Sequence, residues 1–207
     1  YESAVGKADA LLLGFTTVAM AALARLRAGD ARPRLMALVF WSALACGVLT
    51  KGPVTPLVVA LTLTALALWE RRIAGMRQLL WWPGPLLALL LLAPWVLAIN
   101  TATEGRFFAD MLFGDLLPKV LGGDEGHFAP PGYHLLLLPL LIFPASYALP
   151  AAARLALGAL RAPRTEATQA PLRFLLAWAA PTFLLFELLP TKLPHYPLPT
   201  YPAIALL

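Results

Sequence analysis

Residues 35–69 read LMALVFWSALACGVLTKGPVTPLVVALTLTALALW and contain one charged side chain, Lys51. The run is interrupted by TKGP at residues 50–53, where glycine and proline favour a turn. The leucine- and alanine-rich halves show no alternation of apolar and polar residues, which favours helices over barrel strands. We therefore predict two short membrane-spanning helices joined by a tight turn.

The rest of the chain has the same character, with 60% hydrophobic and 13% charged residues among 207. Soluble proteins average about 45–50% apolar and about 25% charged residues. This composition excludes a disordered chain and a coiled coil, and the single cysteine, Cys46, excludes a disulfide scaffold. We predict an all-α, polytopic transmembrane helix bundle with about six spans and the start of a seventh near Leu198. The six predicted spans are Ala10–Leu26, Leu35–Leu49, Pro53–Trp69, Leu79–Ile99, Tyr133–Ala153 and Leu172–Leu189.

The charged residues of the loops orient these spans. If the first span runs inward, 11 of the 16 basic residues lie in inner loops, and 8 of the 11 acidic residues lie outside. Cytoplasmic loops of membrane proteins carry an excess of lysine and arginine. The net charge of +5 is therefore a signal of topology, and no nucleic-acid partner is expected.

The predicted outer side carries all three histidines, one long loop at about residues 100–132 and a proline-rich segment at residues 190–202. We interpret residues 1–207 as part of one transmembrane domain of a larger protein. No secretory signal opens the chain, and it stops within the apolar run AIALL. Any chemistry is expected on the outer side.

Asp9 and Lys51 both lie at the predicted outer membrane edge. Asp9 could be an N-cap of the first span, or an acid that holds a sugar hydroxyl or assists a base. Lys51 could extend its ammonium to the interface, or it could neutralise the phosphate of a lipid-borne substrate. Spacing leaves both alternatives open for each residue.

The segment PTKLPHYPLPTYP (190–202) carries Lys192, His195, Tyr196 and Tyr201 among five prolines. This proline density excludes regular helix and favours an extended return to the membrane. The segment is either a rigid interfacial linker with an aromatic belt or a stiff backbone that preorganises polar groups.

The long outer loop ends in GGDEGHFAPPGYH and exceeds ordinary connections, which indicates a functional loop or lid. We expect a short amphipathic interfacial helix followed by a glycine-rich hinge. His127 and His134 could bind a divalent metal together with His195, although His-x6-His is not a recognised ligand spacing.

Four motifs together resemble the membrane glycosyltransferases of the GT-C fold. Within that class they are most similar to the bacterial protein-O-mannosyltransferase-like and aminoarabinose-transferase-like group. The last motif is the most specific, because it is similar to the S/T-K-L-P-x-Y-x-L-P-x-Y-P segment of that group. The motifs are KADALLL (7–13), LTKGP (49–53), GHFAPPGY (126–133) and TKLPHYPLPTYPAIALL (191–207).

This resemblance implies a partial GT-C bundle that moves a sugar from a polyprenyl-phosphate donor to a lipid A, protein or glycan acceptor, with inversion at the anomeric carbon. It also implies a multi-pass protein of the bacterial inner membrane whose site faces the periplasm. The implied site residues are Asp9, matching the second outer acid of the family and catalytic, and Lys51, Lys192, His195, Tyr196 and His127 for donor binding.

The chemistry agrees with this resemblance, since a lipid phosphate leaving group needs charge stabilisation and the acceptor hydroxyl needs a base. The first acidic residue of the family lies in an earlier outer loop, so residues 1–207 alone are expected to be inactive. The chain departs from the family in two places. The long loop keeps only Arg106 and Lys119 of an arginine-rich motif, and His195 stands where many relatives have a small or polar residue.

Two other classes remain. A transporter or flippase would also be polytopic, with proline-broken helices, but it predicts ionisable residues near mid-membrane and internal repeats. A non-catalytic scaffold predicts that the outer charged residues can be replaced without loss of activity. The sequence names neither the sugar nor the acceptor.

Overall fold

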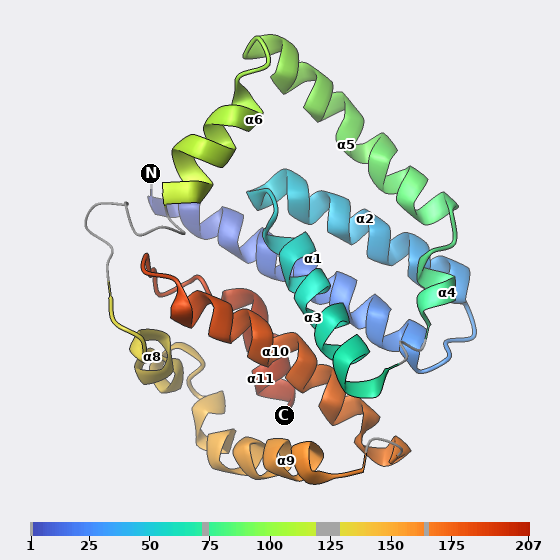
Figure 1. The fold of residues 1–207 in the computed structure, drawn as a ribbon, viewed down its shortest axis with the longest axis vertical. Helices are drawn as coiled ribbons and strands as arrows, with labels where there is room; N and C mark the ends of the chain where they lie inside the picture. The colour runs from blue at the N-terminus through green and yellow to red at the C-terminus, as the bar shows by residue number, and fades with distance from the viewer. Residues whose placement is uncertain (1, 72–74, 119–128, 164–165) are drawn as a thin grey trace.

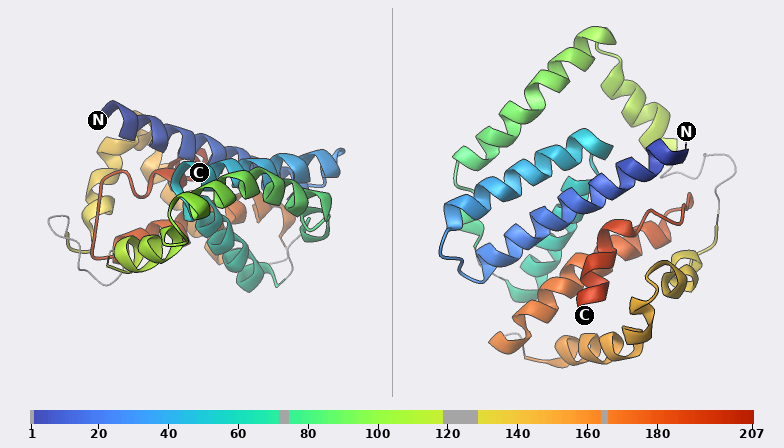
Figure 2. Two further views of the ribbon diagram at one scale, coloured as in Figure 1. Left: turned by 90° about the horizontal axis from the view of Figure 1, so that it is seen from above. Right: turned by 180° about the vertical axis from the view of Figure 1, so that it is seen from behind.

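The computed structural model describes residues 2–71, 75–118, 129–163 and 166–207. In these ranges the chain folds into an elongated bundle of helices (Figures 1 and 2), which confirms the all-α prediction. The main helices are α1 (Glu2–Arg27), α2 (Pro33–Lys51), α3 (Val54–Glu70), α4 (Met76–Leu79), α5 (Pro83–Ala102), α6 (Phe107–Ala109), α8 (Tyr133–Leu141), α9 (Leu149–Arg161), α10 (Ala170–Leu188) and α11 (Tyr201–Leu206). The shorter helical turns are η1 (Asp110–Leu116), η2 (Ala145–Ala148), η3 (Ala167–Gln169) and η4 (Leu198–Thr200).

The packed centre is formed by α1, α2, α3 and α10, with α2 against α1 and α3 against α10 (Figure 1). Its apolar core includes Met20, Phe40 and Val58, each of which is almost fully buried. Small residues bring the helices together, and a side chain at Gly47 would collide with Thr55 of α3. Such close contacts are typical of membrane bundles, where lipid supplies no hydrophobic drive between helices.

The transmembrane character is confirmed by four helices, within the part of the chain that the structure describes, that are long and apolar enough to cross a membrane. The shorter apolar helix α3 has 17 residues. Helix α11 begins close to the predicted start of the seventh span. The four long segments are Ala8–Arg27, Pro33–Lys51, Pro83–Ala102 and Ala167–Leu188.

The prediction of a continuous fifth span, Tyr133–Ala153, is wrong. Helix α8 ends at Leu141, α9 begins at Leu149, and the two axes differ in direction by 113°. Pro144 lies in the connection, and its ring can neither donate an N–H nor continue the first helix. The segment is therefore a bent pair of helices, as in a broken span or a re-entrant loop, and α9 lies along the lower edge of the bundle in Figure 1.

Helix α5 starts beside α2, where Gly84 contacts Trp41, and then diverges from the bundle (Figures 1 and 2). Most of its leucines are exposed, which suits a surface that faces lipid or further protein. Residues 107–116 then turn back as α6 and η1, which confirms a helix in the long outer loop. The predicted glycine-rich hinge lies outside the described residues.

Charged side chains gather at the two ends of the central helices. The part of α1 from Asp9 to Arg27 is about 27 Å long, close to the roughly 30 Å of a hydrocarbon core. Lys51 pairs with Asp9 at one end, and Glu70 pairs with Arg27 at the other. We name these the Asp9 end and the Glu70 end.

Candidate active site

Asp9 lies inside α1 and not at its start. The helix begins at Glu2, so the interpretation of Asp9 as the N-cap is wrong. The residue is only 8% exposed, and its carboxylate contacts Lys51 at the end of α2. A continuous helix through residues 2–9 therefore leaves this carboxylate free for tertiary contacts.

The predicted turn after Lys51 is confirmed. Helix α2 ends at Lys51, and α3 begins at Val54. Gly52 has φ +61°, a value that favours glycine because it has no Cβ. The Lys51 ammonium donates to Oδ1 of Asp9, while its side chain stays 35% exposed. Since an ammonium has three N–H groups, donors remain for a ligand.

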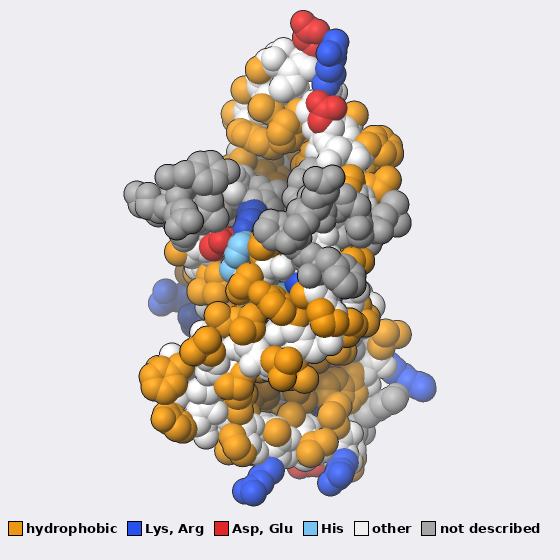
Figure 3. Space-filling model, turned by 90° about the vertical axis from the view of Figure 1, so that its left-hand side faces the viewer, with side chains coloured by type: hydrophobic (Ala, Val, Ile, Leu, Met, Phe, Trp, Pro, Cys, Tyr) orange, Lys and Arg blue, Asp and Glu red, His pale blue; other side chains and the backbone are white. Residues whose placement is uncertain are grey.

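His195 joins this pair from the proline-rich segment. Its Nε2 lies 3.9 Å from Oδ2 of Asp9, so one carboxylate contacts both a lysine and a histidine. Burial lowers the pKa of the His195 imidazole; the Asp9 carboxylate opposes this shift, and the Lys51 ammonium adds to it. Figure 3 shows a histidine next to acidic and basic side chains, within a face that is otherwise largely hydrophobic.

The proline-rich segment is held against α10 by its aromatic residues and backbone. The Tyr196 ring lies 5.6 Å from the Phe186 ring and 5.5 Å from the His195 ring. Trp178 Nε1 donates to the carbonyl of Pro199 at 3.0 Å. As predicted, residues 190–200 form no regular α-helix, and they contain bends, a bridge residue at Thr191, turns and η4; the prediction fails at residues 201–202, where α11 begins. The result is a fixed backbone that presents His195 to Asp9.

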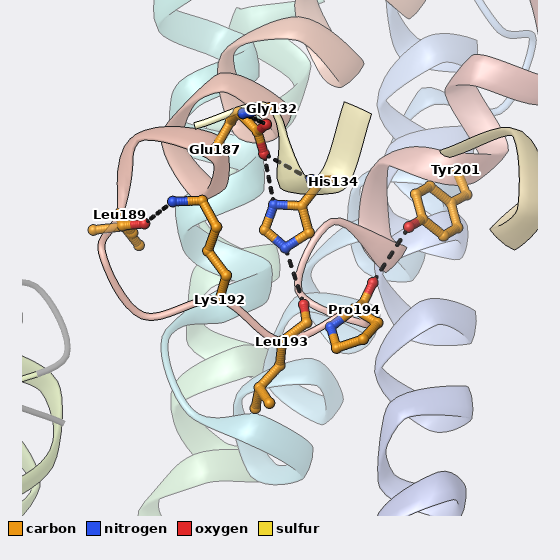
Figure 4. A network of polar contacts seen from close by, with 8 residues as sticks. All are labelled: Gly132, His134, Glu187, Leu189, Lys192, Leu193, Pro194 and Tyr201. Atoms are coloured by element: carbon orange, nitrogen blue, oxygen red, sulfur yellow. Dashed lines mark hydrogen bonds and ion pairs between the residues drawn. The ribbon is translucent and has the colours of Figure 1, made fainter. Parts of the chain in front are cut away.

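Lys192 lies in a different environment from Lys51. It is 3% exposed, and its ammonium donates to the carbonyl of Leu189 at 2.5 Å, just past the end of α10 (Figure 4). Cations near a helix C-terminus interact favourably with the helix dipole. In this structure Lys192 stabilises the end of α10, and its contact with the donor stays a prediction.

His134 and Glu187 form a second polar group at this end (Figure 4). Nδ1 of His134 lies 2.8 Å from Oε2 of Glu187, and Nε2 lies 3.0 Å from the carbonyl of Leu193. Sequence analysis did not single out Glu187. Its only signal was an acid at the end of an apolar run, directly before the proline-rich segment.

The geometry of the described residues does not support the predicted metal site at His127, His134 and His195. Within residues 2–71, 75–118, 129–163 and 166–207, no three His, Cys, Asp or Glu side chains are grouped to hold a metal ion. Both ring nitrogens of His134 already have protein partners. His127, the predicted closing residue of the outer loop, lies outside the described residues.

The Glu70 end differs in chemistry. The Glu70 carboxylate accepts two hydrogen bonds of 3.0 Å from Arg27 and lies 3.5 Å from Nε of Arg173. Arg173 also donates to the carbonyls of Pro163 and Glu166, which ties the α9–α10 connection to the bundle. A cavity of about 1040 Å³ lies beside these residues between α1 and α10, remote from Asp9.

Comparisons with known proteins agree with this architecture. Residues 7–106 match the family described as dolichyl-phosphate-mannose-protein mannosyltransferase. Relatives named undecaprenyl phosphate-alpha-4-amino-4-deoxy-L-arabinose arabinosyl transferase are 35% identical over 184 residues in Pseudomonas aeruginosa (strain LESB58) and over 190 residues in Pectobacterium atrosepticum. The alignments cover 86% and 88% of this chain and 32% of each relative, so the chain spans about a third of their length.

Two solved structures share the fold. ArnT from Cupriavidus metallidurans bound to undecaprenyl phosphate has a TM-score of 0.76 at 24% identity, covering 96% of this chain and 35% of ArnT. The apo state gives 0.71 at 22% identity, with 96% and 34% coverage. Over the third of their length that it spans, this chain is similar in sequence to these transferases and shares the fold of ArnT, in agreement with the resemblance of its motifs to the aminoarabinose-transferase-like group.

Proposed function

We propose that this chain provides part of the active site of a membrane glycosyltransferase. The enzyme would move a sugar from a polyprenyl-phosphate carrier to a hydroxyl of lipid A, a protein or a glycan. The observation that carries this proposal is the Asp9 carboxylate, paired with the partly exposed Lys51 and next to His195. The names of the relatives support undecaprenyl phosphate-linked 4-amino-4-deoxy-L-arabinose as the first donor to test.

The reaction needs two kinds of group at the Asp9 end. The acceptor oxygen forms a bond to the anomeric carbon, while the bond from that carbon to the phosphate oxygen breaks and its electron pair stays on the phosphate. The acceptor proton passes to a carboxylate base, and Asp9 holds a hydroxyl of the sugar or assists that base. A spare N–H of Lys51 stabilises the charge that develops on the leaving phosphate.

We assign the Asp9 end to the periplasmic face of the bacterial inner membrane, because the arginine-rich loops belong at the other end. In a Cys46→Ser background, Glu104→Cys should react with an impermeant thiol reagent in intact cells, since Glu104 is exposed near the end of α5. Arg154→Cys, on α9, should react only after lysis. The reverse pattern would overturn the orientation.

The direct test is donor turnover by the full-length protein in liposomes, measured as release of free undecaprenyl phosphate and formation of glycosylated acceptor. Wild type should give both products, and Glu104→Gln, which alters an exposed acid, should match it. Movement of intact donor across the bilayer without bond cleavage would instead identify a flippase. Full turnover by an Asp9→Ala/Lys51→Ala double variant would identify an active site elsewhere.

A further inference from the structure

The His134–Glu187 pair joins three segments that are distant in sequence. His134 stands at the start of α8, Glu187 at the end of α10, and Leu193 in the proline-rich segment (Figure 4). His134 is fully buried, and Glu187 is 8% exposed. This network therefore costs desolvation, and its hydrogen bonds must offset that cost.

Glu187 is saturated with donors. Its Oε1 accepts from the backbone N–H of Gly132, and its Oε2 accepts from the N–H of His134 at 3.1 Å and lies 2.8 Å from Nδ1. These backbone donors are the free N–H groups at the start of α8, where a carboxylate is favoured. Glu187 thus fixes both the start of α8 and the plane of the imidazole ring.

The other ring nitrogen reaches the proline-rich segment. A carbonyl oxygen can only accept, so Nε2 of His134 must carry the proton shared with Leu193. The same carbonyl accepts from the backbone N–H of Tyr196 at 3.0 Å, which closes the turn around Pro194 and His195. One imidazole N–H therefore binds the backbone of the turn that presents His195 to Asp9.

We propose that His134 is a positioning residue, held by Glu187, that fixes the turn at residues 192–196 and thereby the approach of His195 to Asp9. Its role in transfer rests on the proposed function, whereas its effect on the turn does not. The pair acts through backbone and ring orientation, and His134 need not touch the donor.

Two variants of similar size distinguish the contribution of the Nε2 hydrogen bond from that of the Nδ1 hydrogen bond. The amide of His134→Gln can reach the position of Nε2 and keep the bond to Leu193, whereas that of His134→Asn reaches only the position of Nδ1. Hydrogen–deuterium exchange of the full-length protein should show faster exchange at residues 191–200 in His134→Asn than in wild type or His134→Gln. The amide of Tyr196 reports the turn directly because it donates to Leu193, and the amides of Leu198 and Thr200, which donate to His195 and Pro197, report the residues that follow it.

Turnover should follow the same order. His134→Gln should stay within about threefold of wild-type kcat/KM, and His134→Asn should lose about tenfold, the equivalent of one hydrogen bond. In a His195→Ala background this loss should largely disappear, because the two residues act in series. A purely structural role would give equal losses in both backgrounds.

The outcomes distinguish the two hypotheses. If exchange changes as expected but wild type transfers no sugar, the positioning contact stands and the proposed function fails. If His134→Asn exchanges like wild type, or if His134→Gln is the more disturbed variant, the positioning role is overturned. Arg154→Ala, on an exposed face of α9, is the matched control and should leave exchange at residues 191–200 unchanged.

Discussion

The two ends of the bundle use the same arrangement for different purposes. Each places one carboxylate between two nitrogen-bearing side chains from other segments, Asp9 at one end and Glu70 at the other. At the Glu70 end both arginine side chains are at most 7% exposed, and they clamp α1, α3 and the α9–α10 connection. At the Asp9 end the Lys51 side chain is 35% exposed. Spare donors and solvent access are the reason that we propose chemistry at the Asp9 end and a structural role for the Glu70 end.

The largest effect should come from Asp9→Asn. It removes the charge and the proton-accepting capacity while it preserves size, so kcat should fall by about 10²–10⁴-fold, the range for acid–base groups. Thermal stability should change little, since the amide oxygen can still accept from Lys51. Steady-state turnover of the full-length protein measures this, with Glu104→Gln as the matched control. Activity near wild type would remove Asp9 from the mechanism.

Glu70→Ala should lower the free energy of unfolding and leave the rate of sugar transfer largely unchanged. It leaves Arg27 and Arg173 buried without their carboxylate, and such a loss costs about 3–5 kcal/mol. The midpoint of detergent or thermal unfolding should drop accordingly, while kcat per folded molecule stays near wild type. Asp30→Ala is the control at the same end: its partner Arg25 is largely exposed, so the loss should be at most about 1 kcal/mol. Equal losses in the two variants would contradict a clamp at Glu70.

Lys51→Ala should reduce kcat/KM for the donor by about 10²-fold, the effect of removing one donor to a developing oxyanion. Lys51→Arg should recover part of this loss, since it restores a cation at the same turn. Arg154→Ala removes a positive charge from the opposite end and should have little effect. If Lys51→Ala lowers only the stability and leaves kcat/KM unchanged, the Lys51–Asp9 pair has a structural role, like the ion pairs of Glu70.

The smallest effect should be a shift in pH dependence through His195. Because burial lowers the pKa of His195 below its ordinary value of 6.5, the folded protein binds this proton less well than the unfolded chain. Stability should therefore fall as pH drops below about 6.5, and the acid limb of kcat/KM should lie below that pH.

Lys51→Met should move this limb to higher pH, since the ammonium helps to lower the pKa of His195. His195→Gln has no imidazole to titrate, so the part of the pH dependence that comes from His195 should disappear. An unchanged limb in both variants would show that another group controls the acid side of the profile.

The comparison of the two ends also shows which features could be predicted. Four long apolar helices, the TKGP turn and the absence of α-helix over residues 190–200 follow from composition and proline content, and the described residues confirm them. The fifth span was predicted as continuous because residues 133–153 are largely apolar, and hydropathy does not report the bend of 113° between α8 and α9. The N-cap alternative for Asp9 fails because the helix begins at Glu2, eight residues before the predicted apolar span that starts at Ala10.

The sequence by itself determined the class of this protein. Scarce charge and long apolar runs require a helical bundle in lipid, because backbone groups there must pair within each segment. Only the tertiary structure decided which polar groups meet: Asp9 pairs with Lys51 across 42 residues of chain, and His134 pairs with Glu187 across 53. Patterns along a chain report local periodicity and turn preferences. A pairing over such distances depends on how whole helices pack, and that packing brings one carboxylate to each end of the bundle for a different task.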